Sequence, residues 1–222
     1  MKKILLTSAL IISALSFGQI HWNNTRFGIT GGGNYSRVAQ AHNPSGPRYT
    51  VQFGGIVLIP IEKTHQFFIQ PEVLYYGAGE TGKDRDLKGK DGYDAVYGNN
   101  YLSVPVYLKG YFSEAESEFF GMAGPRFNFL LWQNVKNTPQ NRPYYNPDVD
   151  DTANPSLNGK ASGFNFGIGL GIGYSYKRQL ELTLKYDIGL SDTYPGLSKE
   201  PGGSDKNKSE QVIAVTINYI FK

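Results

Sequence analysis

The sequence predicts an all-β fold, an eight-stranded antiparallel up-and-down transmembrane β-barrel, and three observations indicate it. Apolar residues alternate with other residues at a period of two over most of the chain, which is the period of a strand. Glycine and aromatic residues are frequent, with 27 Gly, 16 Tyr and 13 Phe in 222 residues, and this combination is typical of alternating strands. The connections between these segments are alternately long and short.

The first 18 residues (1–18) have the pattern of a secretory signal peptide. Two lysines precede an apolar stretch over residues 4–15, and small residues follow at Ser16 and Gly18, as at a cleavage site. A transmembrane anchor is the alternative, but the apolar stretch is short for a bilayer span. We expect the mature chain to begin at Gln19.

Eight alternating segments follow within residues 19–222. They are expected at 25–36, 49–61, 66–77, 100–112, 118–132, 162–177, 179–192 and 210–221. Tight turns follow the second, fourth and sixth segments, and long polar loops are expected at 37–48, 78–99, 133–161 and 193–209. Outer-membrane barrels alternate turns and loops in this way, which predicts that the turns and both termini are periplasmic and the long loops extracellular.

One face of each segment is nearly free of charge, as Leu180, Leu182 and Leu184 show. A soluble barrel would bury this face as its core, whereas a membrane barrel turns it to lipid and fills the lumen with the polar face. The apolar faces with few interruptions, the signal peptide and the alternating loop lengths favour the membrane barrel. Each segment is long enough, since about 9 to 11 tilted residues cross the bilayer core.

The opposite faces carry charges that nearly balance. The expected lumen polar network consists of Glu72, Lys109, Arg126, Glu181, Lys185 and Asp187. Because buried charges are tolerated when they are paired and hydrogen-bonded, we expect a salt-bridged core that blocks the lumen. A polarised ion path is the alternative.

Glycine occupies every second position from Gly167 to Gly173. A phosphate-binding loop would need a helix to follow, and a membrane helix would need about 20 apolar residues, so neither fits this run. We expect these glycines to face a narrow lumen and to make space for Arg126, Lys109 or Lys185.

Aromatic residues and prolines add two expectations. Two interfacial girdles are expected, one near the turns with Phe67, Phe112, Phe119, Tyr174, Tyr219 and Phe221, and one near the loops with Tyr49, Tyr75, Phe129 and Phe164. Pro71, Pro105 and Pro125 fall inside strands of a barrel that has no free edge, so local bulges are expected there.

Three stretches, YLSVPVYLKGYF (101–112), GMAGPRFNFLL (121–131) and LTLKYDIGLSDTY (182–194), carry a family resemblance. The chain resembles the PorT-like small outer-membrane β-barrels of Bacteroidetes, often described as porin-family proteins. The matching positions are Tyr101, Leu102, Val104, Pro105, Leu108 and Lys109, then Gly124 and Pro125, then Tyr186, Gly189 and Leu190, and finally Phe221. The resemblance implies an integral outer-membrane barrel, with no assigned activity.

No catalytic, cofactor or metal site is expected. The three histidines, His21, His42 and His65, are scattered, and Glu181 and Asp187 lie six residues apart on one strand, roughly 20 Å at ~3.3 Å per residue. The chain has no cysteine and a net charge of only +3, which argues against disulfides, thiolate-bound metals and nucleic acid.

The third long loop offers two further candidates. Its carboxylates Asp148, Asp150 and Asp151 are oxygen ligands of the kind that Ca²⁺ takes, but the glycine and distal glutamate of an EF-hand are missing, so a solvated acidic loop is favoured. Tyr144 and Tyr145 form a candidate recognition surface, since exposed aromatic residues favour binding. The alternative is a loop that packs over the barrel mouth.

The sequence therefore predicts a non-enzymatic integral outer-membrane protein. Its expected role is that of a scaffold or partner-binding component of the cell envelope, in contact with outer-membrane lipid and with an envelope or secretion-machinery protein. A narrow passive pore for ions or very small solutes is the alternative function.

Overall fold

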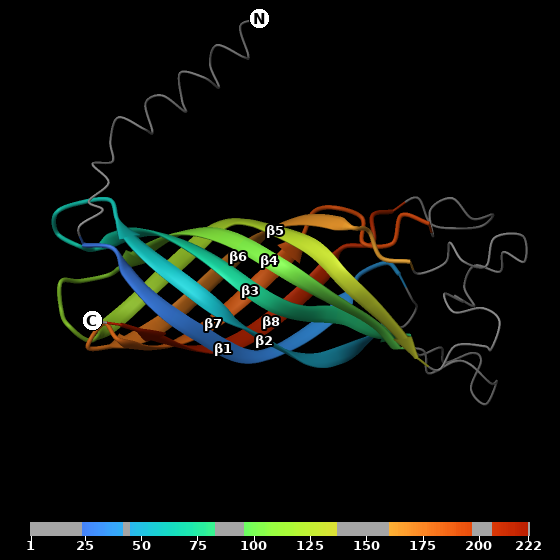
Figure 1. The fold of residues 1–222 in the computed structure, drawn as a ribbon, viewed down its shortest axis with the longest axis horizontal. Helices are drawn as coiled ribbons and strands as arrows, with labels where there is room; N and C mark the ends of the chain where they lie inside the picture. The colour runs from blue at the N-terminus through green and yellow to red at the C-terminus, as the bar shows by residue number, and fades with distance from the viewer. Residues whose placement is uncertain (1–23, 42–44, 83–95, 137–159, 197–205, 222) are drawn as a thin grey trace, which may run out of the picture.

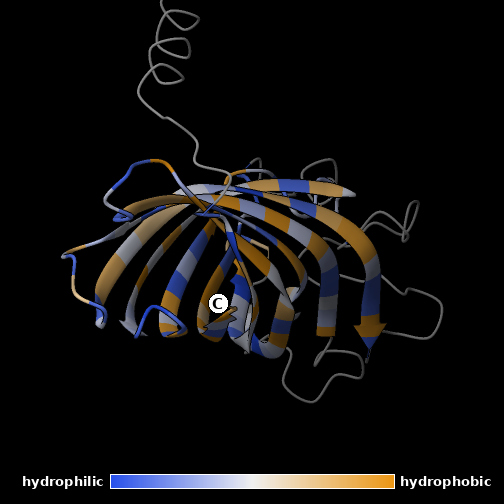
Figure 2. Ribbon diagram, turned by 60° about the vertical axis from the view of Figure 1, so that its left-hand side comes forward, coloured by the Kyte–Doolittle hydropathy of each residue, from blue (hydrophilic) through white to orange (hydrophobic). Residues whose placement is uncertain are grey.

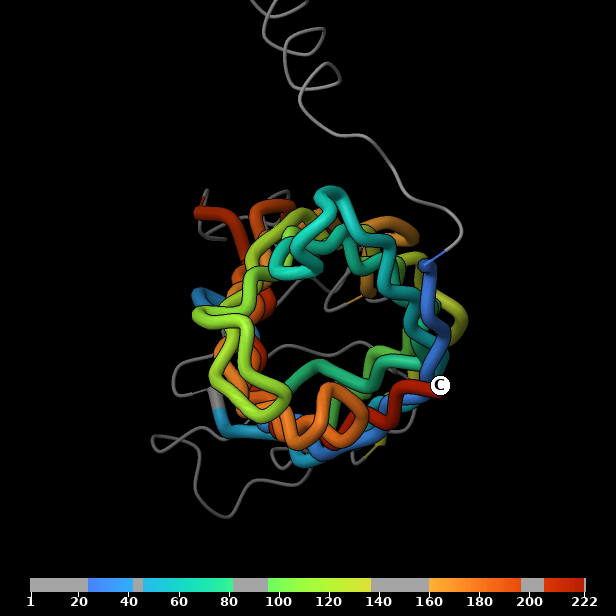
Figure 3. Tube along the Cα trace, turned by 90° about the vertical axis from the view of Figure 1, so that its left-hand side faces the viewer, coloured from blue at the N-terminus to red at the C-terminus, as the bar shows by residue number. Residues whose placement is uncertain are grey.

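The computed structural model describes residues 24–41, 45–82, 96–136, 160–196 and 206–221. Eight strands form in these residues: β1 (Arg26–Val38), β2 (Ser45–Pro60), β3 (Phe67–Gly82), β4 (Val96–Tyr111), β5 (Glu118–Lys136), β6 (Phe164–Tyr176), β7 (Leu180–Gly189) and β8 (Glu210–Ile220). Each strand pairs antiparallel with the next, and β8 pairs with β1. The result is the closed ring of Figure 3, which confirms the expected fold class.

The two ends of the barrel differ. The tight connections β2–β3, β4–β5 and β6–β7 lie at one end together with the described chain ends, and the other four connections leave from the opposite end (Figure 1). These are called the turn end and the loop end below. The signal peptide expected at 1–18 lies outside the described residues.

Five strands run further toward the loop end than the sequence pattern predicts. The loops expected at 37–48, 78–99 and 133–161 are shortened because β1, β2, β3, β4 and β5 extend into them. The β3–β4 ladder shows the reason, since it continues through Ala78 opposite Asn99 and Gly79 opposite Gly98. Backbone hydrogen bonding between the strands therefore continues through residues that do not alternate between apolar and polar.

β7, by contrast, ends before the expected residue 192. The backbone N–H groups of Leu190 and Ser191 both donate to the carbonyl of Phe166, at 2.8 and 3.2 Å. This shared acceptor bends the chain away from the ladder after Gly189.

Side chains alternate between the inside and the outside of the wall, and the ribbon in Figure 2 changes between hydrophilic and hydrophobic colours along each strand. Most outward side chains are apolar. The expected girdle residues are all exposed: Phe67, Phe112, Phe119, Tyr174, Tyr219 and Phe221 at the turn end, and Tyr49, Phe129 and Phe164 at the loop end. Tyr75 is half-buried, and its ring stacks on Trp132 with centroids 5.8 Å apart. The inward side chains include most of the buried polar and charged residues.

The expectation of bulges at the three prolines is wrong. Pro71 lies opposite Val106, Pro105 opposite Arg126 and Pro125 opposite Ile168, without a shift in register. The register shifts lie nearer the loop end, in the β2–β3 and β4–β5 ladders. A proline removes one donor from the ladder, but the pairs on either side of it keep the register, so no residue has to be inserted.

The alternate glycines of β6, Gly167 to Gly173, face the lumen, where neighbouring atoms approach them closely. A Cβ atom at Gly169 would lie 2.7 Å from both the Tyr107 hydroxyl and a carboxylate oxygen of Asp187, and one at Gly171 would lie 2.8 Å from Met122. A Cβ at Gly173 would overlap the Phe120 ring. The glycines therefore make space chiefly for Tyr107, Met122, Phe120 and Asp187, rather than for Arg126, Lys109 or Lys185 as expected.

A single side chain ties the turn end together. The Arg178 guanidinium donates to the carbonyls of His65 at 2.6 Å and Ser113 at 3.1 Å, which belong to the other two tight turns. It also pairs with the carboxylate of Glu118 and lies 4.5 Å from the centroid of the Tyr111 ring. Arg178 itself has φ of +49°, in the left-handed region, so these contacts hold it in a conformation that non-glycine residues rarely adopt.

Candidate functional site

The candidate site is the charged interior of the barrel. The six inward charges that the sequence pattern indicates come together as three ion pairs, Lys109–Glu181, Lys185–Glu72 and Arg126–Asp187. All six side chains are buried. One member of each pair lies on β7, and the partners come from β4, β3 and β5, so the pairs reach across the lumen.

The Lys109–Glu181 pair lies nearest the turn end. The Lys109 ammonium donates to both carboxylate oxygens of Glu181, at 2.6 and 2.7 Å. The Tyr111 hydroxyl and the Asn218 amide also donate to Glu181, at 2.7 and 3.3 Å. The Phe120 ring lies under the ammonium, with its centroid 4.0 Å away. The carboxylate is thus held by three donors, as a buried charge requires.

The Lys185–Glu72 pair has the same design. The Lys185 ammonium donates to both oxygens of Glu72, at 2.9 and 2.8 Å, and the Gln70 amide donates to one of them at 2.7 Å. The Tyr107 ring lies 5.2 Å from the ammonium. Gln70 and Glu72 are neighbours on the inward face of β3, which explains why they meet.

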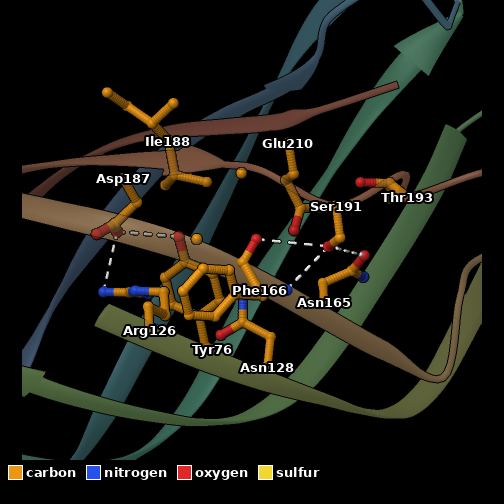
Figure 4. Close-up of a pocket in the computed structure, with 13 residues that line it drawn as sticks. Tyr76, Arg126, Asn128, Asn165, Phe166, Asp187, Ile188, Ser191, Thr193 and Glu210 are labelled. Atoms are coloured by element: carbon orange, nitrogen blue, oxygen red, sulfur yellow. Dashed lines mark hydrogen bonds and ion pairs between the residues drawn. The ribbon is translucent and has the colours of Figure 1, made fainter. Parts of the chain in front are cut away.

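The Arg126–Asp187 pair is held less completely (Figure 4). One guanidinium nitrogen of Arg126 lies 3.0 Å from Asp187 Oδ2 and donates to the Tyr107 hydroxyl at 2.9 Å. The Tyr76 hydroxyl donates to Asp187 at 3.1 Å, and the Tyr76 ring lies 4.3 Å from the guanidinium carbon. Nε and Nη1 of Arg126 and Oδ1 of Asp187 have no protein partner.

A small polar cavity adjoins this pair on the loop side. Its volume is about 10 Å³, and Arg126, Asp187, Asn128, Thr193 and Glu210 are among the residues that line it. Each of these five side chains has at least one buried polar atom without a protein partner. A cavity of this size and polarity suits a single bound water, so the space left in the described lumen at this level is too small for a solute.

A second group of buried side chains packs together at the loop end. Val38, Ala41, Tyr97, Ala161 and Tyr194 form a buried apolar cluster there. The Asn99 amide donates to the Tyr194 hydroxyl at 3.2 Å and to Glu210 at 3.3 Å. Burial raises the pKa of the Tyr194 phenol well above its usual value, so this hydroxyl stays neutral.

Sequence reasoning missed part of the network. Three further residues hydrogen-bond to the ion pairs: Tyr76, Tyr111 and Asn218. The hydroxyl of a fourth residue, Tyr101, accepts a hydrogen bond from the Asn165 amide at 3.2 Å. The period-two pattern places these residues on the inward faces, and that was the available signal. The predicted network contains charged residues alone, whereas a buried tyrosine hydroxyl also needs a hydrogen-bond partner.

The loop candidates Tyr144, Tyr145, Asp148, Asp150 and Asp151 lie outside the described residues. In the part of the chain that is described, no group of three His, Asp or Glu side chains is placed to hold a metal ion. The same part contains no helix long and apolar enough to cross a membrane.

The closed barrel with an apolar outside and a buried ionic interior defines the class: an integral β-barrel whose outer face meets lipid. A family model described as "Outer membrane protein beta-barrel domain" matches residues 17–194 of the chain, which is more than half of it. The chain therefore belongs to this family of outer-membrane β-barrels. None of the curated proteins compared with the chain matches it.

Several solved structures are similar at low sequence identity. The attachment invasion locus protein Ail of Yersinia pestis is 9% identical, with 88% of this chain and 98% of that chain covered and a TM-score of 0.45. The outer membrane enzyme PagL is 12% identical, with 86% and 98% covered and a TM-score of 0.47. Neisserial surface protein A is 11% identical, with 89% and 97% covered and a TM-score of 0.44.

Proposed function

We propose that the protein is a non-enzymatic scaffold of the outer membrane, with a sealed lumen and a partner-binding surface at the loop end. The observation that carries this proposal is the set of three buried ion pairs across the lumen, with the apolar cluster around Tyr97 and Tyr194 above them. An eight-stranded barrel has an interior just wide enough for side chains to fill it. A filled interior leaves the wall and the loops as the working surfaces.

The proposed orientation places the turn end and both termini in the periplasm and the loop end outside the cell. Short turns on one side and longer connections on the other support it, because outer-membrane barrels are built in this way. The expected partner is an envelope or secretion-machinery protein. Tyr144 and Tyr145 remain the candidate recognition residues.

The geometry of the described residues supports the non-enzymatic part of the proposal. Catalysis by a side-chain nucleophile needs that nucleophile next to a base. His65, the histidine in the described part of the chain, lies in the β2–β3 turn with its Nε2 atom 3.3 Å from the Asn24 amide. The carboxylates of Glu181, Glu72 and Asp187 are engaged by Lys109, Lys185 and Arg126, so these three are poorly placed to accept a substrate proton.

Single-channel recording in planar bilayers tests the sealed lumen. The purified protein is expected to give no stable open events, and Leu184→Ala, which changes an outward neighbour of Lys185, serves as the matched control. The proposal fails if the protein gives stable open events that Arg126→Ala or Lys185→Ala abolishes or rescales while Leu184→Ala does not.

That failing result would establish the second candidate, a narrow passive pore for ions or very small solutes. The polar cavity beside Arg126 is the observation that favours it, since its unpartnered donors and acceptors are groups that water or an ion would contact. A conducting path would have to separate Arg126 from Asp187.

Crosslinking in intact envelopes tests the partner-binding surface. The unchanged protein and a Tyr144→Ala/Tyr145→Ala variant are crosslinked and captured side by side, with heat-modifiable gel mobility as the check that both have folded. A specific envelope protein crosslinked to the unchanged chain and lost from the variant is the expected result. Identical crosslinking patterns would remove the two tyrosines from the recognition surface.

A further inference from the structure

The outer wall is hollowed on one side near the turn end. A depression of about 580 Å³ crosses β3, β4, β5 and β6. Its lining consists of Phe67, Leu108, Gly110, Tyr111, Phe112, Gly121, Met122, Ala123, Leu170, Gly171 and Ile172. Every side chain that opens onto it is carbon-rich, and its size falls within the usual range of about 300 to 1,000 Å³ for ligand clefts.

Small outward residues create this hollow. Gly110 and Gly121 are directly paired across β4 and β5, and Ala123 pairs with Leu108. A Cβ atom at Gly121 would lie 3.6 Å from the Phe112 ring, an ordinary contact, so close packing does not require glycine there. Because Gly110 and Gly121 have no side chains, their backbone forms the floor of the hollow. The exposed Phe112 ring lies beside it.

A second hollow of about 430 Å³ lies on the other side of β6. It is lined by Leu170, Gly171, Ile172, Leu184, Lys185, Tyr186 and Ile213. Both hollows share Leu170 and Ile172, whose exposed side chains form a ridge between them. Two adjoining hollows with an apolar ridge between them match a ligand that has two hydrocarbon chains.

The turns below the grooves carry exposed charges of both signs. Glu114 and Glu116 are exposed on the β4–β5 turn, and Lys177 is exposed on the β6–β7 turn. The two turns are joined, since the Lys177 backbone N–H donates to the Ser117 hydroxyl at 2.9 Å. Exposed carboxylates and an exposed ammonium on two joined turns complement a headgroup that carries an amine next to a phosphate.

A second copy of the chain fits the grooves less well. Lipid tails are as apolar as leucine, so association of two proteins in the bilayer depends on close packing and polar contacts. The lining of the first hollow offers no exposed polar side chain, and that of the second offers the Tyr186 hydroxyl alone, because Lys185 is buried against Glu72. A flexible acyl chain, in contrast, takes the shape of a groove and recovers the dispersion contacts that an empty groove lacks.

We propose that the outer wall from β3 to β8 binds one amine-bearing diacyl phospholipid. One acyl chain lies in each hollow, with the ridge of Leu170 and Ile172 between the chains. The headgroup lies at the turns that carry Glu114, Glu116 and Lys177. This site lies on the outside of the barrel. It is independent of whether the lumen conducts and of which protein the loop end binds.

Native mass spectrometry after purification from bilayers containing equal amounts of phosphatidylethanolamine and phosphatidylglycerol tests the proposal. Gly121→Leu fills the floor of the groove. Gly33→Leu is the matched control, because Gly33 faces outward on β1 and an added Cβ there meets no atom within 4 Å. Heat-modifiable gel mobility shows that both variants have folded.

One retained phosphatidylethanolamine is expected in the unchanged protein and in Gly33→Leu, with the lipid-bound fraction about tenfold lower in Gly121→Leu. Equal retention in the two variants overturns the site. Retention of phosphatidylglycerol to the same extent overturns the headgroup assignment, whereas a preference that Glu114→Gln/Glu116→Gln abolishes supports it.

A disulfide crosslinking experiment in the same bilayers tests the competing occupant. Ala123→Cys places a thiol in the groove, and Gly33→Cys is the control. Crosslinked dimers that form with Ala123→Cys and not with Gly33→Cys show that a second copy covers the groove, which overturns the lipid proposal. Equal, low crosslinking in both variants is the result expected if lipid fills it.

Discussion

The ten residues of β7 form an inner and an outer face that lie in different surroundings. The inner face is buried in the polar lumen, and the outer face meets lipid. Inside, Glu181 is fully buried, with 0% of its surface exposed, in an ion pair with three donors around the carboxylate. Outside, the adjacent Leu182 is 55% exposed on the barrel surface. The comparison teaches that polarity alone does not identify the core of such a protein. Pairing makes the inner face stable, and apolarity makes the outer face stable in lipid.

Removing one partner of an inner ion pair is expected to have the largest effect. Glu72→Ala leaves the Lys185 ammonium buried and uncompensated, which is expected to lower the free energy of unfolding by about 3 to 5 kcal/mol. Urea unfolding of the protein refolded into lipid vesicles measures the change. A loss below about 1 kcal/mol would show that water reaches Lys185 and that the lumen is not sealed.

Placing a charge on the outer face is expected to cost somewhat less. Leu184→Arg, near the middle of β7, is expected to lower the free energy of unfolding in vesicles by about 2 to 4 kcal/mol, because a cation there faces hydrocarbon. The same unfolding assay measures it. If this variant were as stable as the unchanged protein, Leu184 would not face lipid and the assignment of the outer face would be lost.

Adding a methyl group separates the two faces by packing alone. Gly173→Ala is expected to cost about 1 to 3 kcal/mol, since its Cβ overlaps the Phe120 ring inside the lumen. Gly33→Ala, on the outside with no atom near its added Cβ, is expected to change stability by less than about 0.5 kcal/mol. Equal losses in the two variants would contradict the close packing of the lumen.

Replacing a whole inner ion pair is expected to have the smallest effect. Lys185→Met/Glu72→Leu removes both charges together, so no uncompensated charge stays buried, and the loss of stability is expected to be below about 1 kcal/mol. The double-mutant cycle with both single variants measures the coupling between the two side chains. A double variant as unstable as Glu72→Ala would show that the surrounding polar groups, Gln70 among them, depend on the charges.

The period of two in the sequence, taken together with the alternating loop lengths and the apolar faces, predicted the fold. It placed alternate residues on opposite faces of each strand and led to the eight strands and to the closed barrel that the structure has. It also put Lys109, Arg126 and Lys185 on the inward face, where the structure has them. Which carboxylate each cation contacts did not follow, because that depends on the stagger between strands far apart in the chain, such as β3 and β7.

The errors have a common physical origin. Strand ends were placed where apolar alternation stops, but backbone pairing continues past that point, as between Gly79 and Gly98. Bulges were expected at Pro71, Pro105 and Pro125 from the lost donor alone, and the neighbouring pairs maintain the register. Cooperative pairing along a ladder is a property of several strands together, so the residues of one strand do not report it.

The contacts of Arg178 have a consequence for how the barrel closes. Its guanidinium holds carbonyls from the β2–β3 and β4–β5 turns, while its own carbonyl accepts a hydrogen bond at 3.2 Å from Arg26 at the start of β1. All three hairpins and the first strand therefore meet at one residue. Correct alignment of one hairpin therefore favours alignment of the others, and Arg178 couples the three turns to the strand that closes the barrel against β8.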